Sequence, residues 1–187
     1  RVTTLSRYPE VLTMEEQSVD EKELWELLSE PLREACTKFV EARTREGQHL
    51  KEDLLSKLQE LDRKVTLVEE RSPQVVQAYR NKLEQKVHEL LEDSQIDDNR
   101  IAAEVILFSD KICNDEETVR LHSHIHGMQK ILLETEGVGR KMDFMAQEMN
   151  REANTILSKS NDLEVSNLAI DLKTEIEKIR EQIQNIE

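Results

Sequence analysis

The sequence has 187 residues, of which 37% are apolar, 35% are charged and only 3% are aromatic, with 4 Gly and 3 Pro. This composition favours long amphipathic helices and opposes a sheet-rich domain, which needs turn residues and β-branched or aromatic runs. The net charge of −14 argues against the basic surface that phosphate binding normally requires, and it suits hard divalent cations, which take oxygen ligands.

Several features indicate a cytoplasmic protein. No apolar run approaches the roughly 18 residues that would span a membrane, and the N-terminus lacks the apolar region of a signal peptide. The two cysteines, Cys36 and Cys113, lie far apart in unrelated contexts, as in proteins of a reducing compartment. Because the chain begins with Arg1 and not Met, we expect it to be part of a longer protein.

The first segment, residues 1–19, is predicted to be extended and to be the remnant of a missing N-terminal domain, because Pro9 disfavours helix at the residue before it. A helix is predicted to begin with Asp20 as its N-cap. Pro31 is expected to kink or restart this helix.

The segment 20–95 is predicted to form a long antiparallel helical hairpin. Apolar residues repeat on both arms at alternating spacings of four and three, which is the heptad pattern of a coiled-coil seam. Ser72 and Pro73 stand between the arms in the N-cap and N1 order that begins a helix, so the turn is predicted there. The first seam is Leu54, Leu58, Leu61, Val65 and Val68, and the second is Val76, Tyr79, Leu83, Val87 and Leu90.

The segment 96–187 is predicted to be a helical domain that carries the active site. It follows a loop at 93–98 and has a turn at 137–139. Helices are expected at about 99–112, 115–134, 140–158 and 162–187 from the apolar periodicity. The fold class is therefore all-α, with a long hairpin, a C-terminal helical bundle and a short extended N-terminal segment.

The predicted helix 140–158 has an unusual polar face. An apolar stripe of Met, Ala and Ile lies on one side, and a stripe rich in Asn, Gln, Ser and Asp lies on another, where solvated helices usually carry Glu, Lys and Arg. Such a face either binds a ligand or pairs with another helix, and both alternatives stay open. The polar stripe is Asp143, Gln147, Asn150, Arg151, Asn154 and Ser158, with Glu148, Glu152 and Lys159 on its flank.

Three histidines alternate in the stretch RLHSHIHGM. His122 and His126 lie one turn apart and could bind a metal together, although a place in solvent or at an interface is the favoured interpretation. His124 points about 200° away from His122, so the three cannot form one site on one helix. His124 lies with Arg120 and with Glu116 or Glu117, which makes it the better candidate for acid–base or ligand chemistry.

Glu104 is a single charge in the apolar run IAAEVILF. A carboxylate in such a run is either paired with a basic side chain or bound to a cation. Elsewhere the four glycines exclude phosphate-binding loops, and no HExxH or GxSxG motif occurs.

At these same residues the sequence resembles the bacterial, stress-induced YicC-like family. The resemblance covers essentially the whole chain and is carried by GRKMDFMAQEMNREANTILSKSND, IEKIREQIQNIE, EARTREGQHL and DEE..RL.SHI. The family pattern includes Arg120 and His124 but passes over His122 and His126. The chain departs from it at Glu10, where Gly is usual, and at Cys113, where Asp is common.

The resemblance implies a metal-dependent endoribonuclease that cleaves single-stranded or hairpin RNA, not DNA, as a ring-shaped hexamer. It implies that this chain is the larger, C-terminal part of such a protein. The rival interpretations are a non-enzymatic helical assembly or adaptor module, whose seams bind partner helices, and an RNA chaperone without catalysis.

Residue roles follow as hypotheses from the resemblance. Four carboxylates would bind Mg²⁺ or Mn²⁺, four residues would act in catalysis, and six would bind RNA. We expect the helix carrying Asp143 to face the helices carrying Glu104 and His124. The expected metal ligands are Glu104, Asp143, Glu148 and Glu152; the catalytic residues are Glu117, Arg120, His124 and Arg151; the RNA-binding residues are Arg140, Lys141, Gln147, Asn150, Asn154 and Lys159.

Overall fold

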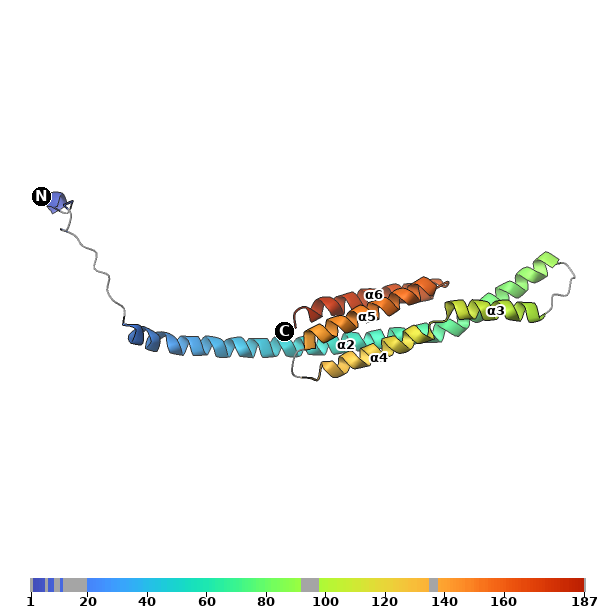
Figure 1. The fold of residues 1–187 in the computed structure, drawn as a ribbon, viewed down its shortest axis with the longest axis horizontal. Helices are drawn as coiled ribbons and strands as arrows, with labels where there is room; N and C mark the ends of the chain where they lie inside the picture. The colour runs from blue at the N-terminus through green and yellow to red at the C-terminus, as the bar shows by residue number, and fades with distance from the viewer. Residues whose placement is uncertain are drawn as a thin grey trace. The chain divides into compact units, whose positions relative to one another are not determined.

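A computed structural model describes residues 2–5, 7–8, 11, 20–91, 98–134 and 138–186. These residues form helices and no strands, which confirms the predicted all-α class (Figure 1). Two compact units can be distinguished, 1–46 and 47–187. The predicted division into three domains stays a prediction. The helices are α1 (Val2–Leu5), α2 (Glu21–Leu91), α3 (Asp98–Ile112), α4 (Asp115–Ile131), α5 (Val138–Lys159) and α6 (Leu163–Ile183).

In the first unit, α1 is a single helical turn, so the prediction of an extended segment is wrong for Val2–Leu5. Residues 12–19 lie outside the described part of the chain. The predicted N-cap is confirmed, because Asp20 Oδ1 accepts a hydrogen bond from the backbone N–H of Lys22 at 2.9 Å. Pro31 does not restart the helix, since α2 runs through it.

The predicted turn of the hairpin is also wrong, because α2 continues through Ser72 and Pro73 to Leu91. The Ser72 hydroxyl does not cap a new helix but donates back to the carbonyl oxygen of Val68 at 2.9 Å. Proline inside a helix loses one hydrogen bond and costs about 3 kcal/mol. Apolar side chains on both sides of this point, Val68 and Val75, are buried in the core, and this burial outweighs the cost.

The core of the second unit is built from four amphipathic segments. The first predicted heptad seam is confirmed as part of it, since all five of its residues are fully buried. The second seam is only half-buried at the four positions that the structure describes. From the other helices, the largest fully buried side chains are Leu121, Ile125, Met128, Met142, Met149, Ile156, Leu172, Ile176 and Ile179.

The four C-terminal helices lie close to their predicted positions. Asp162 is the N-cap of α6, where its side chain accepts from the backbone N–H groups of Glu164 and Val165. The turn expected at 137–139 is corrected in part: Val138 and Gly139 belong to α5, and residue 137 lies outside the described residues. Within the described ranges, no helix is long and apolar enough to cross a membrane.

Candidate active site

Two buried carboxylates join α4 to α5. Glu117 on α4 is 6% exposed and accepts two hydrogen bonds from Lys159 Nζ on α5, at 2.8 and 2.9 Å. Glu152 on α5 is 5% exposed and accepts from Arg120 on α4 at 3.3 Å. Each helix thus supplies one acid and one base, so both buried charges are compensated across the same interface.

Arg120 is the more accessible of the two cations. Its guanidinium also donates to Glu116 at 2.9 Å, and its side chain is 54% exposed. The hydrogen bond to Glu152, followed by the charges of Glu152 and Glu116, raises the pKa of Arg120 above its usual value. Arg120 therefore stays charged and presents its remaining N–H donors to solvent.

Asp143 and Gln147 face α6 and solvent. Asp143 accepts from Arg180 Nε at 2.9 Å and from the Gln147 side-chain amide at 2.7 Å. The hydrogen bond from Arg180 is the main reason that the pKa of Asp143 is lowered. The Asp143 side chain thus bonds to α6, whereas the Glu152 and Lys159 side chains of the same helix bond to α4. The helix that carries Asp143 therefore packs against α4, which carries His124, as expected, whereas the Asp143 side chain itself is bonded to Arg180 of α6.

The rest of the polar stripe on α5 is surface. Gln147, Arg151, Asn154 and Ser158 are exposed. Arg151 has only a 3.7 Å contact with Glu148 and keeps 75% of its side chain accessible. The Oδ1 atom of Asn150 is buried without a hydrogen-bond partner in the described residues. The four exposed side chains are not covered by another described helix, so they are available to a ligand.

Two more of the expected RNA-binding residues lie near the start of α5. Arg140 and Lys141 are both exposed. Lys141 is 3.5 Å from a carboxylate oxygen of Glu134, at the end of the α4 segment. Both cations therefore lie on the surface, away from the buried pairs near the other end of the helix.

The histidines behave differently from one another. His122 Nδ1 is 2.6 Å from Asp62 Oδ1, and its Nε2 is 3.5 Å from Glu69, so this ring connects α4 to α2, as the interface interpretation predicts. His126 is exposed, with its ring centroid 6.3 Å from that of His122. His124 is half-buried and makes no hydrogen bond or ion pair with any described residue. Both of its ring nitrogens are free for proton transfer.

The four expected metal ligands do not converge within one chain. Glu152 is held by Arg120, Asp143 by Arg180, and Glu104 lies on α3. Among the described residues, no group of three or more His, Cys, Asp or Glu side chains is placed to hold a metal ion. The expected single-chain site therefore does not fit a divalent ion, because such an ion needs several oxygen ligands at once.

Glu104 lies instead in a surface groove between α3, α2 and the junction of α5 and α6. The groove has a volume of about 470 Å³ and contains Lys111 and Lys159 as its cations. Tyr79 of α2 and Phe108 of α3 form its aromatic part, with parallel rings whose centroids are 3.7 Å apart. The sequence placed Glu104 and Lys159 in a predicted site and Tyr79 in an apolar seam, but it did not single out Phe108 or Lys111. The spacing of Glu104, Phe108 and Lys111, four and then three residues, could have shown that they share one face of the helix.

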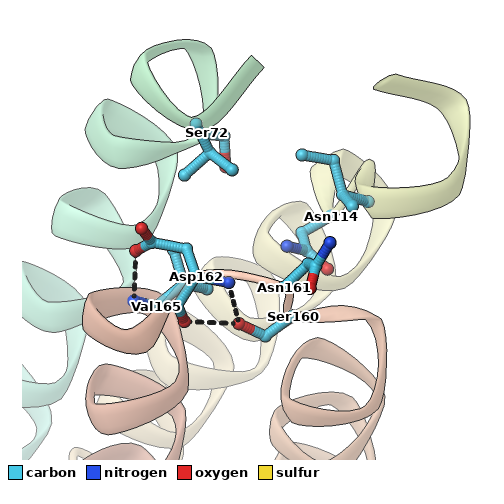
Figure 2. Close-up of a pocket in the computed structure, with 8 residues that line it drawn as sticks. Ser72, Asn114, Ser160, Asn161, Asp162 and Val165 are labelled. Atoms are coloured by element: carbon cyan, nitrogen blue, oxygen red, sulfur yellow. Dashed lines mark hydrogen bonds between the residues drawn. The ribbon is translucent and has the colours of Figure 1, made fainter. Parts of the chain in front are cut away.

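A second, much smaller cavity lies beside the N-cap of α6 (Figure 2). Asn114 is 4% exposed and its Oδ1 has no partner in the described residues. Ser160 donates to the carbonyl oxygen of Asp162 at 3.0 Å, and Arg71 of α2 donates to both carboxylate oxygens of Asp162, at 3.2 and 2.9 Å. With a volume of about 10 Å³ the cavity is no larger than a water molecule, so it serves packing and not substrate binding.

Comparison with known proteins agrees with the resemblance. Residues 68–187 match the family model "Endoribonuclease YicC-like, C-terminal", and residues 1–52 match "Endoribonuclease YicC-like, N-terminal region". A protein of Clostridioides difficile named "Probable endoribonuclease YicC" is 43% identical over 187 residues, and one of the same name from Haemophilus influenzae is 37% identical over 188 residues. All of this chain is covered in both cases, but only 64% and 63% of the relatives. The chain therefore belongs to the YicC-like endoribonuclease family.

Proposed function

We propose that this chain is the RNA-cleaving part of an endoribonuclease that acts on single-stranded or hairpin RNA. The observation that carries the proposal is the match of both YicC-like family models, together with relatives named as endoribonucleases. The structure supports it with His124, which has no hydrogen-bond or ion-pair partner among the described residues and lies one helical turn from the charged Arg120. The sequence contains no glycine-rich phosphate-binding loop and no HExxH or GxSxG motif that would indicate another kind of enzyme.

In this proposal His124 exchanges the proton of the attacking or leaving oxygen. An imidazole with both nitrogens free can accept a proton at one step and donate it at another. Arg120 lies four residues earlier on the same helix, about 6 Å along its axis, and its exposed N–H groups offset the negative charge that develops on the phosphate. Glu116 and Glu152 hold the Arg120 side chain from two directions.

Glu117, although proposed as catalytic from the sequence, has a different role here. Its carboxylate is buried and saturated by Lys159, so it has no access to substrate. We propose that the pair fixes the distance between α4 and α5. Arg151, Arg140 and Lys141 remain candidates for contacts with the RNA backbone, because all three are exposed.

Dependence on Mg²⁺ or Mn²⁺ is part of the proposal. Among the described residues, the carboxylates of one chain form no group that fits the ion, and we propose that the ion takes ligands from more than one chain. A ring-shaped oligomer would bring such ligands together. Cytoplasmic location, expected from the sequence, is likewise proposed.

The test is a cleavage assay with an end-labelled RNA hairpin that has a single-stranded loop, in Mg²⁺, in Mn²⁺ and in EDTA. We expect cleavage with metal and none in EDTA. His124→Ala should lower the rate by about 10² or more. His126→Ala is the matched control on the same helix and should cleave normally.

Two results would contradict the proposal. Equal rates for His124→Ala and the unchanged chain would remove the catalytic role of His124. Binding of the hairpin without cleavage at any metal or protein concentration would favour the RNA chaperone interpretation.

A further inference from the structure

The groove that holds Glu104 brings together three kinds of side chain in a fixed order. Glu104, Phe108 and Lys111 follow each other at spacings of four and three, so they lie along one face of α3. The order is therefore carboxylate, aromatic ring, ammonium. At 1.5 Å per residue, their two backbone positions are about 10 Å apart along the axis, and no ion pair joins Glu104 to Lys111 in the structure.

Both charges are free of other partners. Glu104 and Lys111 are exposed and make no hydrogen bond or ion pair with any described residue. Lys159, at the other side of the groove, is different. Its three N–H donors go to the two carboxylate oxygens of Glu117 and to the carbonyl oxygen of Cys113 at 3.0 Å. Only Lys111 can therefore give its full charge to a ligand.

The aromatic pair is more than packing between two helices. The rings of Tyr79 and Phe108 are parallel, with an interplanar angle of 9°, and both are only half-buried. A half-exposed ring pair at the wall of an open groove offers a flat apolar surface beside two charges. Unpaired bases of RNA stack on such surfaces.

We propose that this groove binds one unpaired nucleotide of the RNA, with its phosphate on Lys111, its base against the ring pair and the edge of its base on Glu104. The axial distance between the two positions is comparable to the length of a nucleotide from the phosphate to the far edge of the base. The inference rests on the proposed function, since that function makes RNA the ligand.

The carboxylate predicts which base is preferred. Glu104 can only accept hydrogen bonds when ionised. Guanine presents two adjacent N–H donors, on N1 and N2, and can fill both carboxylate oxygens at once, as an arginine fork does. Adenine and cytosine present a single amino group, and the one N–H of uracil lies between two carbonyl oxygens that the carboxylate repels. We therefore infer a preference for guanine.

Binding of short oligonucleotides measures this separately from cleavage. The probes are fluorescent heptamers of uridine, with or without one central guanosine, carrying 2′-fluoro groups that prevent attack by the 2′-oxygen. A gel run after each titration verifies that the probe is intact. We expect the unchanged chain to bind the guanosine probe about tenfold more tightly, as for one good bidentate contact.

Three variants separate the parts of the groove. Glu104→Gln should abolish the preference for guanosine. Lys111→Ala should weaken both probes and lower the slope of log affinity against log salt by about 0.7. Tyr79→Leu should weaken both probes by about tenfold through lost stacking. Lys130→Ala, an exposed lysine on α4, is the matched control and should bind like the unchanged chain.

The exposed positions Glu104 and Lys111 keep the test valid even if Tyr79→Leu fails to fold. Equal affinity for the two probes, or Lys111→Ala binding no more weakly than Lys130→Ala, would overturn the inference. If the unchanged chain cleaves the hairpin but the groove variants bind the probes normally, nucleotide binding in the groove is wrong and the proposed cleavage stands. If the groove variants lose binding but the unchanged chain cleaves nothing, nucleotide binding in the groove stands and the proposed cleavage is wrong.

Discussion

The interface between α4 and α5 contains residues with a proposed catalytic role and residues with a structural role. Glu117 belongs to the structural ones, because its carboxylate is buried. A carboxylate that is 6% exposed needs its cation, because an unpaired buried charge is costly. We predict that Lys159→Met lowers the free energy of unfolding by about 3 kcal/mol, as for other broken buried pairs. Urea unfolding followed by circular dichroism measures the change.

The double variant Glu117→Gln with Lys159→Met should recover most of that loss, since no charge is then left buried. Lys130→Met serves as the control, because Lys130 is exposed and has no ion-pair partner among the described residues. If Lys159→Met unfolds at the same urea concentration as Lys130→Met, the pair does not hold the two helices together.

Asp162 makes stability depend on pH. The hydrogen bond from Arg71, with help from the N–H groups of Val165 and Glu164, lowers the pKa of Asp162 in the folded chain. A carboxyl whose pKa is lowered on folding contributes stability above its unfolded pKa of about 3.9, and this contribution is lost as pH falls through the folded value. Asp162→Asn keeps a capping side chain but removes the charge.

We therefore predict that Asp162→Asn is less stable than the unchanged chain at pH 6 and that the difference shrinks steadily below about pH 4. Thermal unfolding at a series of pH values measures it. A difference that stays constant down to pH 3 would mean that the charge of Asp162 contributes nothing.

The sequence indicated some of these residues but not their partners. The family-like pattern and the helical spacing placed Arg120 and Glu117 on one face. The pairing of Arg120 with Glu152, and of Asp143 with Arg180, depends on which helices become neighbours in space. No periodicity within one helix contains that information. For the same reason, the metal site expected from the sequence combined four carboxylates that contact different helices in the structure.

At the scale of elements, α2 shows where local signals mislead. Ser72-Pro73 is a good helix start, yet the chain continues as helix through it. The burial of Leu54, Leu58 and Leu61 was predictable from the heptad spacing alone. The continuation was not predictable, because it depends on which helices lie beside the residues that follow the proline, such as α3, whose Phe108 stacks on Tyr79.

A distance measurement distinguishes one helix from a hairpin. Spin labels at the exposed positions 60 and 85, in a chain with Cys36→Ser and Cys113→Ser, lie 25 residues apart. In a continuous helix their backbone separation is about 38 Å. In a hairpin that turns at 72–73 the two positions face each other at about 10 Å. We predict the long distance by double electron–electron resonance.

A labelled pair at positions 60 and 67 provides the matched control, because this segment is helical in both arrangements. Its backbone separation is about 10 Å. A distribution for 60 and 85 centred near the control value would restore the hairpin and reject the continuous α2.

At the scale of the whole molecule, the two units differ in how well they bury their apolar residues. The core of the second unit buries the heptad seam from Leu54 to Val68 completely, and the seam that follows Pro73 is half-buried at its described positions. The first unit has the same kind of seam, spaced three, four and seven, without cover in the described residues. Its members and their exposed fractions are Trp25 62%, Leu28 53%, Leu32 53% and Phe39 61%.

A seam of this kind favours association with a second copy, because an apolar heptad stripe is stable in water only when another helix covers it. The same feature supports the rival interpretation as an assembly module. Both interpretations agree that the chain should not remain a monomer, and they differ on whether assembly leads to cleavage. The oligomeric state and the activity must therefore be measured on the same samples.

We predict that the chain self-associates at tens of micromolar, as measured by light scattering, and that RNA cleavage appears only as association proceeds. Leu32→Glu places a charge in the seam and should shift the chain towards monomer and abolish cleavage. Thr37→Glu adds the same charge on the exposed, opposite side of the helix and should associate and cleave normally. A uniform monomer with full activity would contradict both parts, because catalysis would then be complete within one chain. Association without cleavage at any concentration would favour the assembly module.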